Sequence, residues 1–343
     1  MKIWKLDNYD NFFEKIIHVS EEQLKEHIKQ VNKRKYYANY FEKEKKKGKR
    51  KIYVVDKNNN LYKIQKNLVN NFFNNIMLTD SCYGFKKGYN YFDFLEKHIY
   101  FLQPRIYLKL DISDFFGSIT TELLKNTFEY YISENISTKE KDKLLKYIIN
   151  IITYNGKIIQ GAITSPVVSN IIFRQLDCRI EKYCFKLDVQ YTRYADDLLF
   201  SSESSVVHSK RFFNAIQKIL LSKNFNLNYS KTLRQDKYIS VNGYVIGGNL
   251  HISRKKLTNL SRILFFLSNI DFKNEELIKN LNDKLKLEQG DESIRFDGKY
   301  SLINYLNGNR AFLLQFLKYS DNQYHYSKIH KIIERIEKIV LEF

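Results

Sequence analysis

The stretch Tyr191-Thr-Arg-Tyr-Ala-Asp-Asp-Leu-Leu-Phe-Ser201 decides the fold of this chain. Two apolar, β-prone runs, 191–194 and 198–200, flank the adjacent acids Asp196 and Asp197. Such runs predict paired strands, which places the two acids at the tip of a hairpin. Adjacent carboxylates repel each other unless a divalent cation neutralises them. Asp is also a common turn residue, so an exposed turn without a ligand explains this stretch equally well when it is taken alone.

The composition of the chain indicates a polyanionic partner. Its 343 residues include 57 Lys and Arg against 38 acidic residues, a net charge of +19, together with 26 Tyr and 25 Phe. Cations that meet phosphates and rings that stack on bases suit nucleic acid. An AT-rich genome also raises Lys, Asn, Ile, Tyr and Phe together, and that bias explains the aromatic count better than it explains the charge.

Cysteine usage and hydropathy predict a cytoplasmic protein without a membrane partner. The three cysteines, Cys82, Cys178 and Cys184, have neither metal-site spacing nor a disulfide framework. The first residues lack the apolar core of a signal peptide. No apolar run approaches the ~20 residues that a membrane helix needs. The pattern becomes continuously helical and basic beyond about residue 250, which predicts a domain boundary there.

Two segments before the hairpin bear charges of the kind that nucleotide chemistry uses. Residues 49–56 form a basic strand, and Cys82-Tyr-Gly-Phe-Lys-Lys-Gly88 is a basic, glycine-punctuated segment. Lysines beside flexible backbone can hold a phosphate chain, although Gly-x-x-x-Gly occurs by chance in many loops. Between these segments and the hairpin, the lone His98 fits a surface or satisfied side chain better than a ligand.

A strand ending at an acid comes next. In residues 104–111 apolar side chains alternate with Tyr107 and Lys109, the pattern of a half-buried strand, and Asp111 follows at its end. An acid between a strand and a helix is a common metal ligand. Asp111 and Asp114 could instead cap the next helix.

A loop of small residues follows, Gln160-Gly-Ala-Ile-Thr-Ser-Pro-Val-Val-Ser-Asn170. Pro166 suits a first helical turn with Ser165 as its cap. Gly161 and Ala162 allow another molecule to approach the backbone closely. Beyond the acidic hairpin we expect an amphipathic helix over 210–221, a turn and strand over 225–232, and a small hairpin over 241–250 with Gly-Gly-Asn at its bend.

The order of these segments resembles the reverse transcriptases over about residues 45–245. The matching pieces are the basic strand, Gly-Phe-Lys-Lys, the strand ending in Asp111, Gln-Gly-x-x-x-Ser-Pro-x-x-x-Asn, Tyr-Ala-Asp-Asp and Asn-x-x-Lys-Thr. The resemblance implies an α+β, right-hand polymerase. Fingers and a palm with an antiparallel sheet would occupy residues 1–250, and a helical thumb would occupy 251–343.

The resemblance also implies a catalytic centre with two magnesium ions, or manganese as the alternative. Asp111 and Asp196 resemble the pair that bridges both ions, and Asp197 resembles a third, less direct carboxylate. The backbone carbonyl of Ile112 would also face the metal. Lys231 matches a lysine that protonates the leaving pyrophosphate, with a plain surface lysine as the alternative.

Further roles follow from the same resemblance. Phe116 matches a ring that clashes with a ribose 2′-hydroxyl and so selects deoxynucleotides; an ordinary core Phe beside Phe115 is the alternative. The residues implied in nucleotide binding are Arg50, Lys51, Lys86, Phe116, Gln160 and Gly161. Those implied in nucleic-acid binding are His98, Ser165, Pro166, Asn170, Asn242 and Gly243.

Within reverse transcriptases the chain is most similar to bacterial retron and retron-like defence enzymes. The shared features are Leu-Lys-Leu-Asp-Ile-Ser-Asp-Phe-Phe, Tyr-Thr-Arg-Tyr-Ala-Asp-Asp and a short chain without an RNase H, endonuclease or maturase extension. Two elements depart from the retron pattern: Phe94-Leu-Glu-Lys-His98 keeps only His98 of Asn-Ala-x-x-His, and Val241-Asn-Gly243 replaces Val-Thr-Gly. In the family these elements engage the retron's own RNA. The departures favour a related defence enzyme that uses another noncoding RNA, or none, over branched DNA synthesis.

The implied function is the copying of a noncoding RNA into DNA in a bacterial anti-phage system, with dNTPs as substrates. One alternative is template-independent synthesis, or protein-primed synthesis that starts from a Tyr hydroxyl. Another is a catalytically idle nucleic-acid-binding scaffold, against which the intact clustered acids argue. The sequence leaves open the RNA, the primer, the phage trigger, an effector protein or second polymerase, and the oligomeric state.

Overall fold

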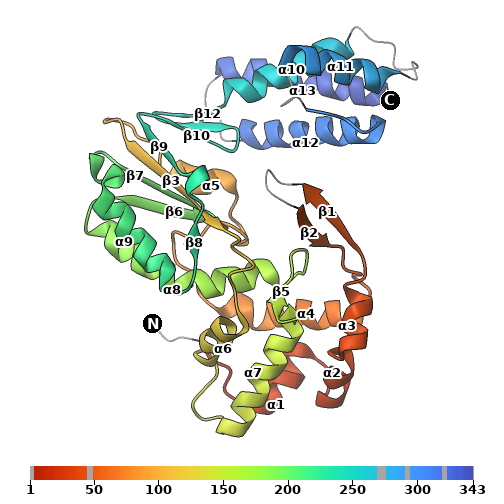
Figure 1. Ribbon diagram of the computed structural model, residues 1–343, viewed down its shortest axis with the longest axis vertical. Helices are drawn as coiled ribbons and strands as arrows, with labels where there is room; N and C mark the ends of the chain where they lie inside the picture. The colour runs from red at the N-terminus through yellow and green to blue at the C-terminus, as the bar shows by residue number, and fades with distance from the viewer. Residues whose placement is uncertain (1–3, 45–48, 269–275, 290–293, 319–322, 343) are drawn as a thin grey trace. The chain divides into compact units, whose positions relative to one another are not determined.

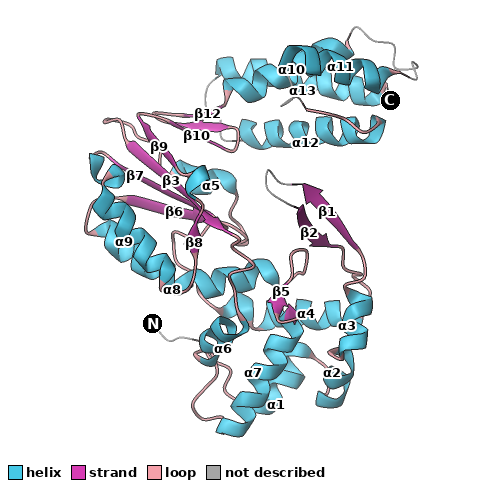
Figure 2. Ribbon diagram, viewed as in Figure 1, coloured by secondary structure: helices cyan, strands magenta, loops and turns pink. Residues whose placement is uncertain are grey.

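The computed structural model describes residues 4–44, 49–268, 276–289, 294–318 and 323–342 (Figure 1). It divides into two compact units. The first contains residues 1–98 and 103–237, and the second contains residues 99–102 and 238–343. Helices and strands alternate irregularly along the chain, and every paired strand is antiparallel (Figure 2). The predicted α+β class is therefore confirmed.

The first unit is built around an antiparallel sheet in the order β6-β7-β3, and both β8 and β9 pair with the other edge of β3. Two small hairpins, β1-β2 and β4-β5, stand apart from it. The strands of this unit are β1 Tyr40–Glu44, β2 Lys49–Tyr53, β3 Ile106–Ser113, β4 Thr153–Tyr154, β5 Lys157–Ile158, β6 Gln190–Tyr194, β7 Asp197–Ser202, β8 Asn226–Leu227 and β9 Leu233–Asp236.

Helices surround this sheet and supply most of the core. The α-helices of the first unit are α1 Tyr9–Asn11, α2 Glu21–His27, α3 Gln30–Tyr36, α4 Asn60–Asn71, α5 Tyr91–Glu96, α6 Thr121–Glu129, α7 Thr138–Ile152, α8 Ser165–Phe185 and α9 Lys210–Leu221. Shorter turns of π or 3-10 helix are η1 Phe12–Ile17, η2 Phe73–Asn75, η3 Ser205–His208 and η4 Tyr229–Lys231.

The two faces of β3 differ in character. Leu108 and Leu110 lie in the main hydrophobic core. Lys109 and Asp111 alternate with them and therefore belong to the opposite face, because successive side chains of a strand point to opposite sides. The same core collects apolar side chains from the surrounding helices, among them Leu68, Leu124, Ile148, Ile172 and Ile216.

Side-chain caps determine where several helices begin. Ser20 forms a capping box with Gln23 at the start of α2. Ser137 and Ser209 accept backbone N–H groups at the starts of α7 and α9. Each such cap stabilises its helix by about 1 kcal/mol, because it satisfies an N–H group that has no partner within the helix. The helix predicted over 210–221 and the acidic hairpin are both confirmed.

Two local predictions need correction. The strand β3 does not stop at Asp111 but continues to Ser113, because Ile112 pairs with Leu227 of β8. Ser165 is not the cap of α8; Thr164 occupies that position, and the Ser165 hydroxyl donates to a loop carbonyl instead. The sequence pattern missed the extension of β3 because its partner Leu227 comes from a distant segment.

In its described residues, the second unit combines a small sheet with four helices. The sheet has the order β10-β11-β12, so the hairpin predicted over 241–250 carries an additional strand, β10, before it. The elements are β10 Ile239–Val241, β11 Tyr244–Ile246, β12 Leu250–Ile252, α10 Arg254–Leu267, α11 Leu277–Gln289, α12 Lys299–Leu317 and α13 Gln323–Leu341. The two compact units divide at residue 237, ahead of β10. The assignment of fingers, palm and thumb stays a prediction.

No helix in the described parts of the chain has the length and apolar character needed to cross a bilayer.

Candidate active site

The acidic pair lies where the hairpin turns. Strands β6 and β7 pair from Gln190 opposite Ser201 to Tyr194 opposite Asp197, which leaves Ala195 and Asp196 in the turn. Ala195 has a φ of 55°, in the left-handed region that residues with a side chain rarely adopt. Such a conformation persists only where its surroundings hold it in place.

Strand β3 brings a third acid to this turn. Asp111 lies directly opposite Asp197 in the β3–β7 register. The backbone N–H of Ile112 donates to the carbonyl oxygen of Asp196 at 3.1 Å, and the carbonyl of Asp111 accepts from the N–H of Asn228 at 2.8 Å. The sheet therefore gathers Asp111, Asp196 and Asp197 at one place, as the sequence predicted.

The charges at this place are only partly balanced. Burial raises the pKa of the Asp196 carboxyl, and the neighbouring charges of Asp197 and Asp111 raise it further. The Lys109 ammonium lies 2.5 Å from Asp197 Oδ1, and the Lys231 ammonium lies 2.9 Å from Asp111 Oδ1. The hydrogen bond to Asp111 raises the pKa of Lys231. Each of the two lysines thus pairs with an acid other than Asp196.

The donor set fits a hard divalent cation at two of the acids. Carboxylate oxygens are the ligands that Mg²⁺ prefers, and Asp111 already accepts one cationic group, the ammonium of Lys231. In the described residues no group of three or more His, Cys, Asp or Glu side chains is arranged to hold a metal. The Asp197 carboxylate pairs with the Lys109 ammonium. Asp111 and Asp196 are thus the better candidates, and Asp197 has the less direct place.

The glycine-punctuated segment runs beside the acidic hairpin. The backbone of Tyr83 donates to the carbonyl of Arg193 at 2.9 Å. At Gly84 an added Cβ would lie only 2.4 Å from the backbone nitrogen of Ala195, so no larger residue fits without movement. Two residues later, the Lys86 ammonium lies over the ring of Tyr89 at 4.4 Å. The structure therefore brings the segment that carries Lys86 to the turn that carries Asp196.

The small-residue loop packs against the basic strand β2. Tyr53 of β2 donates its N–H to the carbonyl of Gln160 at 2.9 Å. Gly161 has a φ of 103°, and an added Cβ would lie 2.0 Å from the Tyr53 carbonyl oxygen. The loop and β2 are thus one local assembly, which also includes the exposed Lys51. Arg50 belongs to β2, but its side chain lies outside the part of the chain that is described.

Phe116 lies at the edge of the main core, partly buried, with its ring 5.4 Å from that of Phe115 in an edge-to-face contact. This position agrees both with an ordinary core Phe and with a ring that excludes a ribose 2′-hydroxyl. The second role stays a prediction.

Three residues predicted to contact nucleic acid are buried. The His98 ring is fully buried; its Nδ1 lies 2.8 Å from Ser201 Oγ, and its Nε2 lies 2.8 Å from Thr192 Oγ1. Ser165 donates its hydroxyl to a carbonyl within the loop, and Asn170 is completely buried. The structure thus places these three side chains in the interior, and their contact with nucleic acid stays a prediction.

The other predicted contacts lie elsewhere. Pro166 is partly exposed in the first turn of α8. Asn242 and Gly243 form the turn between β10 and β11 in the second unit, with φ values of 49° and 90°, which suits a tight hairpin turn. Nucleic-acid contact at these three residues stays a prediction.

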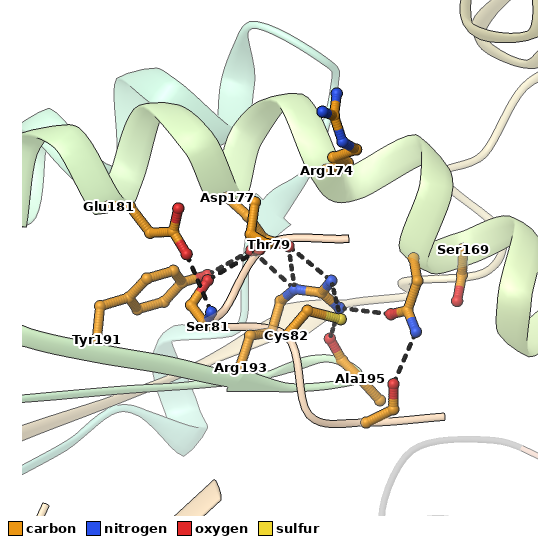
Figure 3. Close-up of polar contacts among 12 residues, drawn as sticks. Thr79, Ser81, Cys82, Ser169, Arg174, Asp177, Glu181, Tyr191, Arg193 and Ala195 are labelled. Carbon is orange, nitrogen blue, oxygen red and sulfur yellow. Dashed lines mark hydrogen bonds and ion pairs between the residues drawn. The ribbon is translucent and has the colours of Figure 1, made fainter. Parts of the chain in front are cut away.

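The sequence analysis did not single out one buried residue that contacts the acidic turn. Arg193, inside the Tyr-Thr-Arg-Tyr-Ala-Asp-Asp motif, is fully buried beneath α8 (Figure 3). Its Nε and Nη2 donate to the two oxygens of Asp177 at 2.9 and 2.8 Å. Its Nη1 donates to Asn170 Oδ1 and to the Ala195 carbonyl, both at 3.1 Å, and Nη2 also contacts Cys82 Sγ at 3.1 Å. The available signal was its position: alternation along β6 directs this arginine to the core face, where a charge needs a buried partner.

Comparison with known proteins adds to this geometry. Residues 41–246 match the family described as "Reverse transcriptase (RNA-dependent DNA polymerase)". The chain is 27% identical over 270 residues to the retron Ec83 reverse transcriptase of Escherichia coli, covering 69% of this chain and 82% of that protein. It is 29% identical to the retron Ec73 enzyme of the same species, covering 49% of this chain and 55% of the relative. For the retron Mx65 enzyme of Myxococcus xanthus, the identity is 27%, with 47% of this chain and 40% of the relative covered.

Similar solved structures include telomerase from Candida albicans in complex with an RNA fragment, with a TM-score of 0.43 and 14% identity. That match covers 89% of this chain and 63% of the telomerase. A foamy viral protease-reverse transcriptase in complex with double-stranded DNA has a TM-score of 0.36 and 14% identity, covering 87% of this chain and 43% of that one.

Proposed function

Because this chain belongs to the reverse transcriptase (RNA-dependent DNA polymerase) family, we propose that it is a retron-type RNA-directed DNA polymerase that copies a noncoding RNA into DNA. One observation carries the proposal: Asp111 stands opposite Asp197 across two strands, while the backbone of Ile112 bonds to Asp196. Carboxylates crowded at a hairpin turn are costly for a protein that only binds nucleic acid, and this cost favours a catalytic role.

In the proposed reaction the 3′-hydroxyl of a primer attacks the α-phosphate of a dNTP, a new P–O bond forms and pyrophosphate leaves. Bound Mg²⁺, or Mn²⁺ in its place, would stabilise negative charge on the phosphate oxygens. Asp111 and Asp196 are the residues proposed to hold it. Lys109 keeps Asp197 oriented, and Lys231, which lies 2.9 Å from Asp111, is proposed to donate a proton to the leaving pyrophosphate.

The nucleotide is proposed to lie between two groups of residues. The segment with Lys86 would meet the triphosphate, because it runs beside the Asp196 turn. Gln160 and Gly161, together with the basic strand β2, would meet the nucleotide and the template, and Phe116 would exclude a ribose 2′-hydroxyl. We also assign fingers and palm to residues 1–250 and a thumb to residues 251–343.

The partners are proposed to be a noncoding RNA template and its DNA product, in a bacterial cytoplasmic system that defends against phage. The net charge of +19 and the retron relatives support an RNA partner. The departures at 94–98 and 241–243 favour an RNA unlike that of the known retrons. An effector protein or second polymerase would complete such a system.

The test is DNA synthesis by the purified protein with its copurified RNA, Mg²⁺ and single labelled dNTPs. We expect labelled DNA from the wild type, and a loss of about 1000-fold or more in Asp196→Asn, because a group that holds transition-state charge is removed. The matched control is Asp142→Asn, which changes an exposed aspartate of α7 and should leave synthesis intact.

RNase treatment separates the mechanisms. Loss of product after RNase supports RNA templating. Product that survives RNase and stays attached to protein would instead support priming from a Tyr hydroxyl. A wild type with no more product than Asp196→Asn would disprove the polymerase function and leave a nucleic-acid-binding scaffold.

A further inference from the structure

We propose that Arg193 is a positioning residue that sets the Asp196 turn and the Gly84-Phe85-Lys86 segment together, through one buried guanidinium. The inference rests on the proposed function, since it assigns Asp196 to the metal and Lys86 to the nucleotide. It concerns a side chain that would touch neither substrate nor metal. Three sets of contacts carry it.

The first set holds the acidic turn. Arg193 Nη1 donates to the carbonyl oxygen of Ala195 at 3.1 Å, and Ala195 has the left-handed φ of 55°. The next residue is Asp196, whose own carbonyl accepts from Ile112 at 3.1 Å. The peptide groups on both sides of the Asp196 side chain are therefore tied, one of them by Arg193. A shift of the Ala195 carbonyl would turn the Asp196 carboxylate.

The second set holds the Gly84-Phe85-Lys86 segment. The backbone N–H of Arg193 donates to the Ser81 carbonyl at 2.7 Å, and its side chain reaches Cys82 Sγ at 3.1 Å. Asn170 Oδ1 accepts from Arg193 Nη1, and Asn170 Nδ2 donates to the Gly84 carbonyl at 2.7 Å. Gly84 is also the residue whose backbone packs against Ala195. One side chain thus joins the two backbone segments that meet at the site.

The third set explains why the residue is an arginine. Nε and Nη2 of Arg193 donate to the Asp177 carboxylate of α8. Nη1 of Arg193 can therefore donate to both Asn170 and the Ala195 carbonyl. The guanidinium also lies over the Phe173 ring at 4.5 Å. A lysine could keep the ion pair with Asp177, but its single ammonium cannot present a planar fork to a carboxylate, an amide and a carbonyl together.

The test compares three variants of the full chain: Arg193→Lys, Asn170→Ala and Tyr191→Phe. Tyr191 donates to Asp177 Oδ1 at 2.8 Å from the side of the cluster away from the acids, so Tyr191→Phe removes a buried hydrogen bond without touching Ala195 or Asn170. Mn²⁺ binding is measured by electron paramagnetic resonance. Binding of a fluorescent dNTP is measured on an RNA template with a dideoxy-terminated DNA primer, so that neither readout needs chemistry.

Arg193→Lys should weaken Mn²⁺ binding by about tenfold or more, because second-layer partners orient metal-binding carboxylates, and should weaken dNTP binding as well. Asn170→Ala should weaken dNTP binding by about tenfold through misplacement of the Lys86 segment, while Mn²⁺ binding stays near that of the wild type. Tyr191→Phe should lower the Tm and leave both affinities unchanged.

Unchanged affinities in Arg193→Lys, or equal losses of affinity in Arg193→Lys and Tyr191→Phe, would overturn the inference. If Arg193→Lys does not fold, the Asn170→Ala variant decides the question. Unchanged dNTP binding in Asn170→Ala would refute the link to the Gly84-Phe85-Lys86 segment. A wild type that binds Mn²⁺ and dNTP but makes no DNA would overturn the proposed function and leave the inference standing. A wild type that binds neither would refute both.

Discussion

Strand β6 carries a buried polar cluster on each of its two faces, and the two clusters differ in charge. On the α8 face, Arg193 is ionised and bonded to Asp177. On the opposite face, Thr192 and Ser201 each bond to the ring of His98. Burial disfavours the charged form of Arg193, but Asp177 outweighs that cost and raises the pKa of Arg193 above its ordinary value. Burial, with the nearby charge of Arg105, lowers the pKa of His98 to about 3.

The difference shows what decides whether a buried group keeps its charge. A carboxylate partner compensates the guanidinium, whereas hydroxyl groups compensate a neutral imidazole but not an imidazolium. The acid cluster at Asp111 and Asp196 is a third case, because like charges are gathered there with incomplete neutralisation. We expect the Arg193 cluster to keep its ion pair near neutral pH. We expect the neutral His98 cluster to lose stability in acid, and the acids to need a cation.

The largest effect on stability should come from breaking the ion pair. Arg193→Met leaves the Asp177 carboxylate buried without its cation, and should lower the free energy of unfolding by about 3–5 kcal/mol. Urea denaturation measures this. The double variant Arg193→Met/Asp177→Leu should recover most of the loss, because an apolar pair can replace a buried ion pair. A single variant as stable as the wild type would contradict the picture of a tightly coupled pair.

The next largest effect on stability should come from the close backbone contact between Gly84 and Ala195. Gly84→Ala should cost about 2–3 kcal/mol, because its Cβ would lie 2.4 Å from the backbone nitrogen of Ala195 and backbone cannot move aside cheaply. Gly308→Ala is the matched control: Gly308 is exposed in α12 with open space around it, and should gain about 0.5–1 kcal/mol from helix propensity. Equal changes in the Tm of the two variants would argue against the contact.

The stability that His98 contributes should depend on pH. The unfolded chain takes up a proton at His98 near the ordinary histidine pKa of 6.5, whereas the folded chain does so only near 3. Stability from this residue is therefore complete above pH 6.5 and is lost as pH falls, by about 2 kcal/mol between pH 7 and pH 5. Denaturation at several pH values measures the slope, which His98→Gln should flatten. His27→Gln, at a partly exposed histidine of α2, should keep it.

The smallest effect should come from the edge of the Arg193 cluster. Tyr191→Phe removes one hydrogen bond to Asp177, which keeps its bonds to Arg193, and should cost about 1 kcal/mol. Thermal unfolding measures it, with DNA synthesis unchanged at a temperature below both transitions. A loss as large as that of Arg193→Met would mean that the tyrosine, rather than the arginine, holds the carboxylate.

Local patterns were enough to predict much of the fold. The acidic hairpin, the helix α9 and the strand before Asp111 follow from alternation, helical periodicity and caps, all of which act between residues close in sequence. The convergence of Asp111 with Asp196 and Asp197 came from family resemblance rather than from any local signal. The pairing of Lys109 with Asp197 was not predicted, because it depends on a diagonal contact between two strands.

The sequence by itself determined the elements, the basic charge and the acids that a cation would need. Only the tertiary structure decided which polar side chains are buried and with whom they pair. In the sequence, His98, Asn170 and Arg193 are all polar residues within motifs. In the fold, the His98 ring is buried and neutral, and Asn170 donates to the Gly84 carbonyl. Arg193 keeps its charge in an ion pair with Asp177. The physical reason is that burying a polar or charged side chain costs free energy, which only a hydrogen-bond or ion-pair partner offsets. In this fold those partners come from distant segments of the chain.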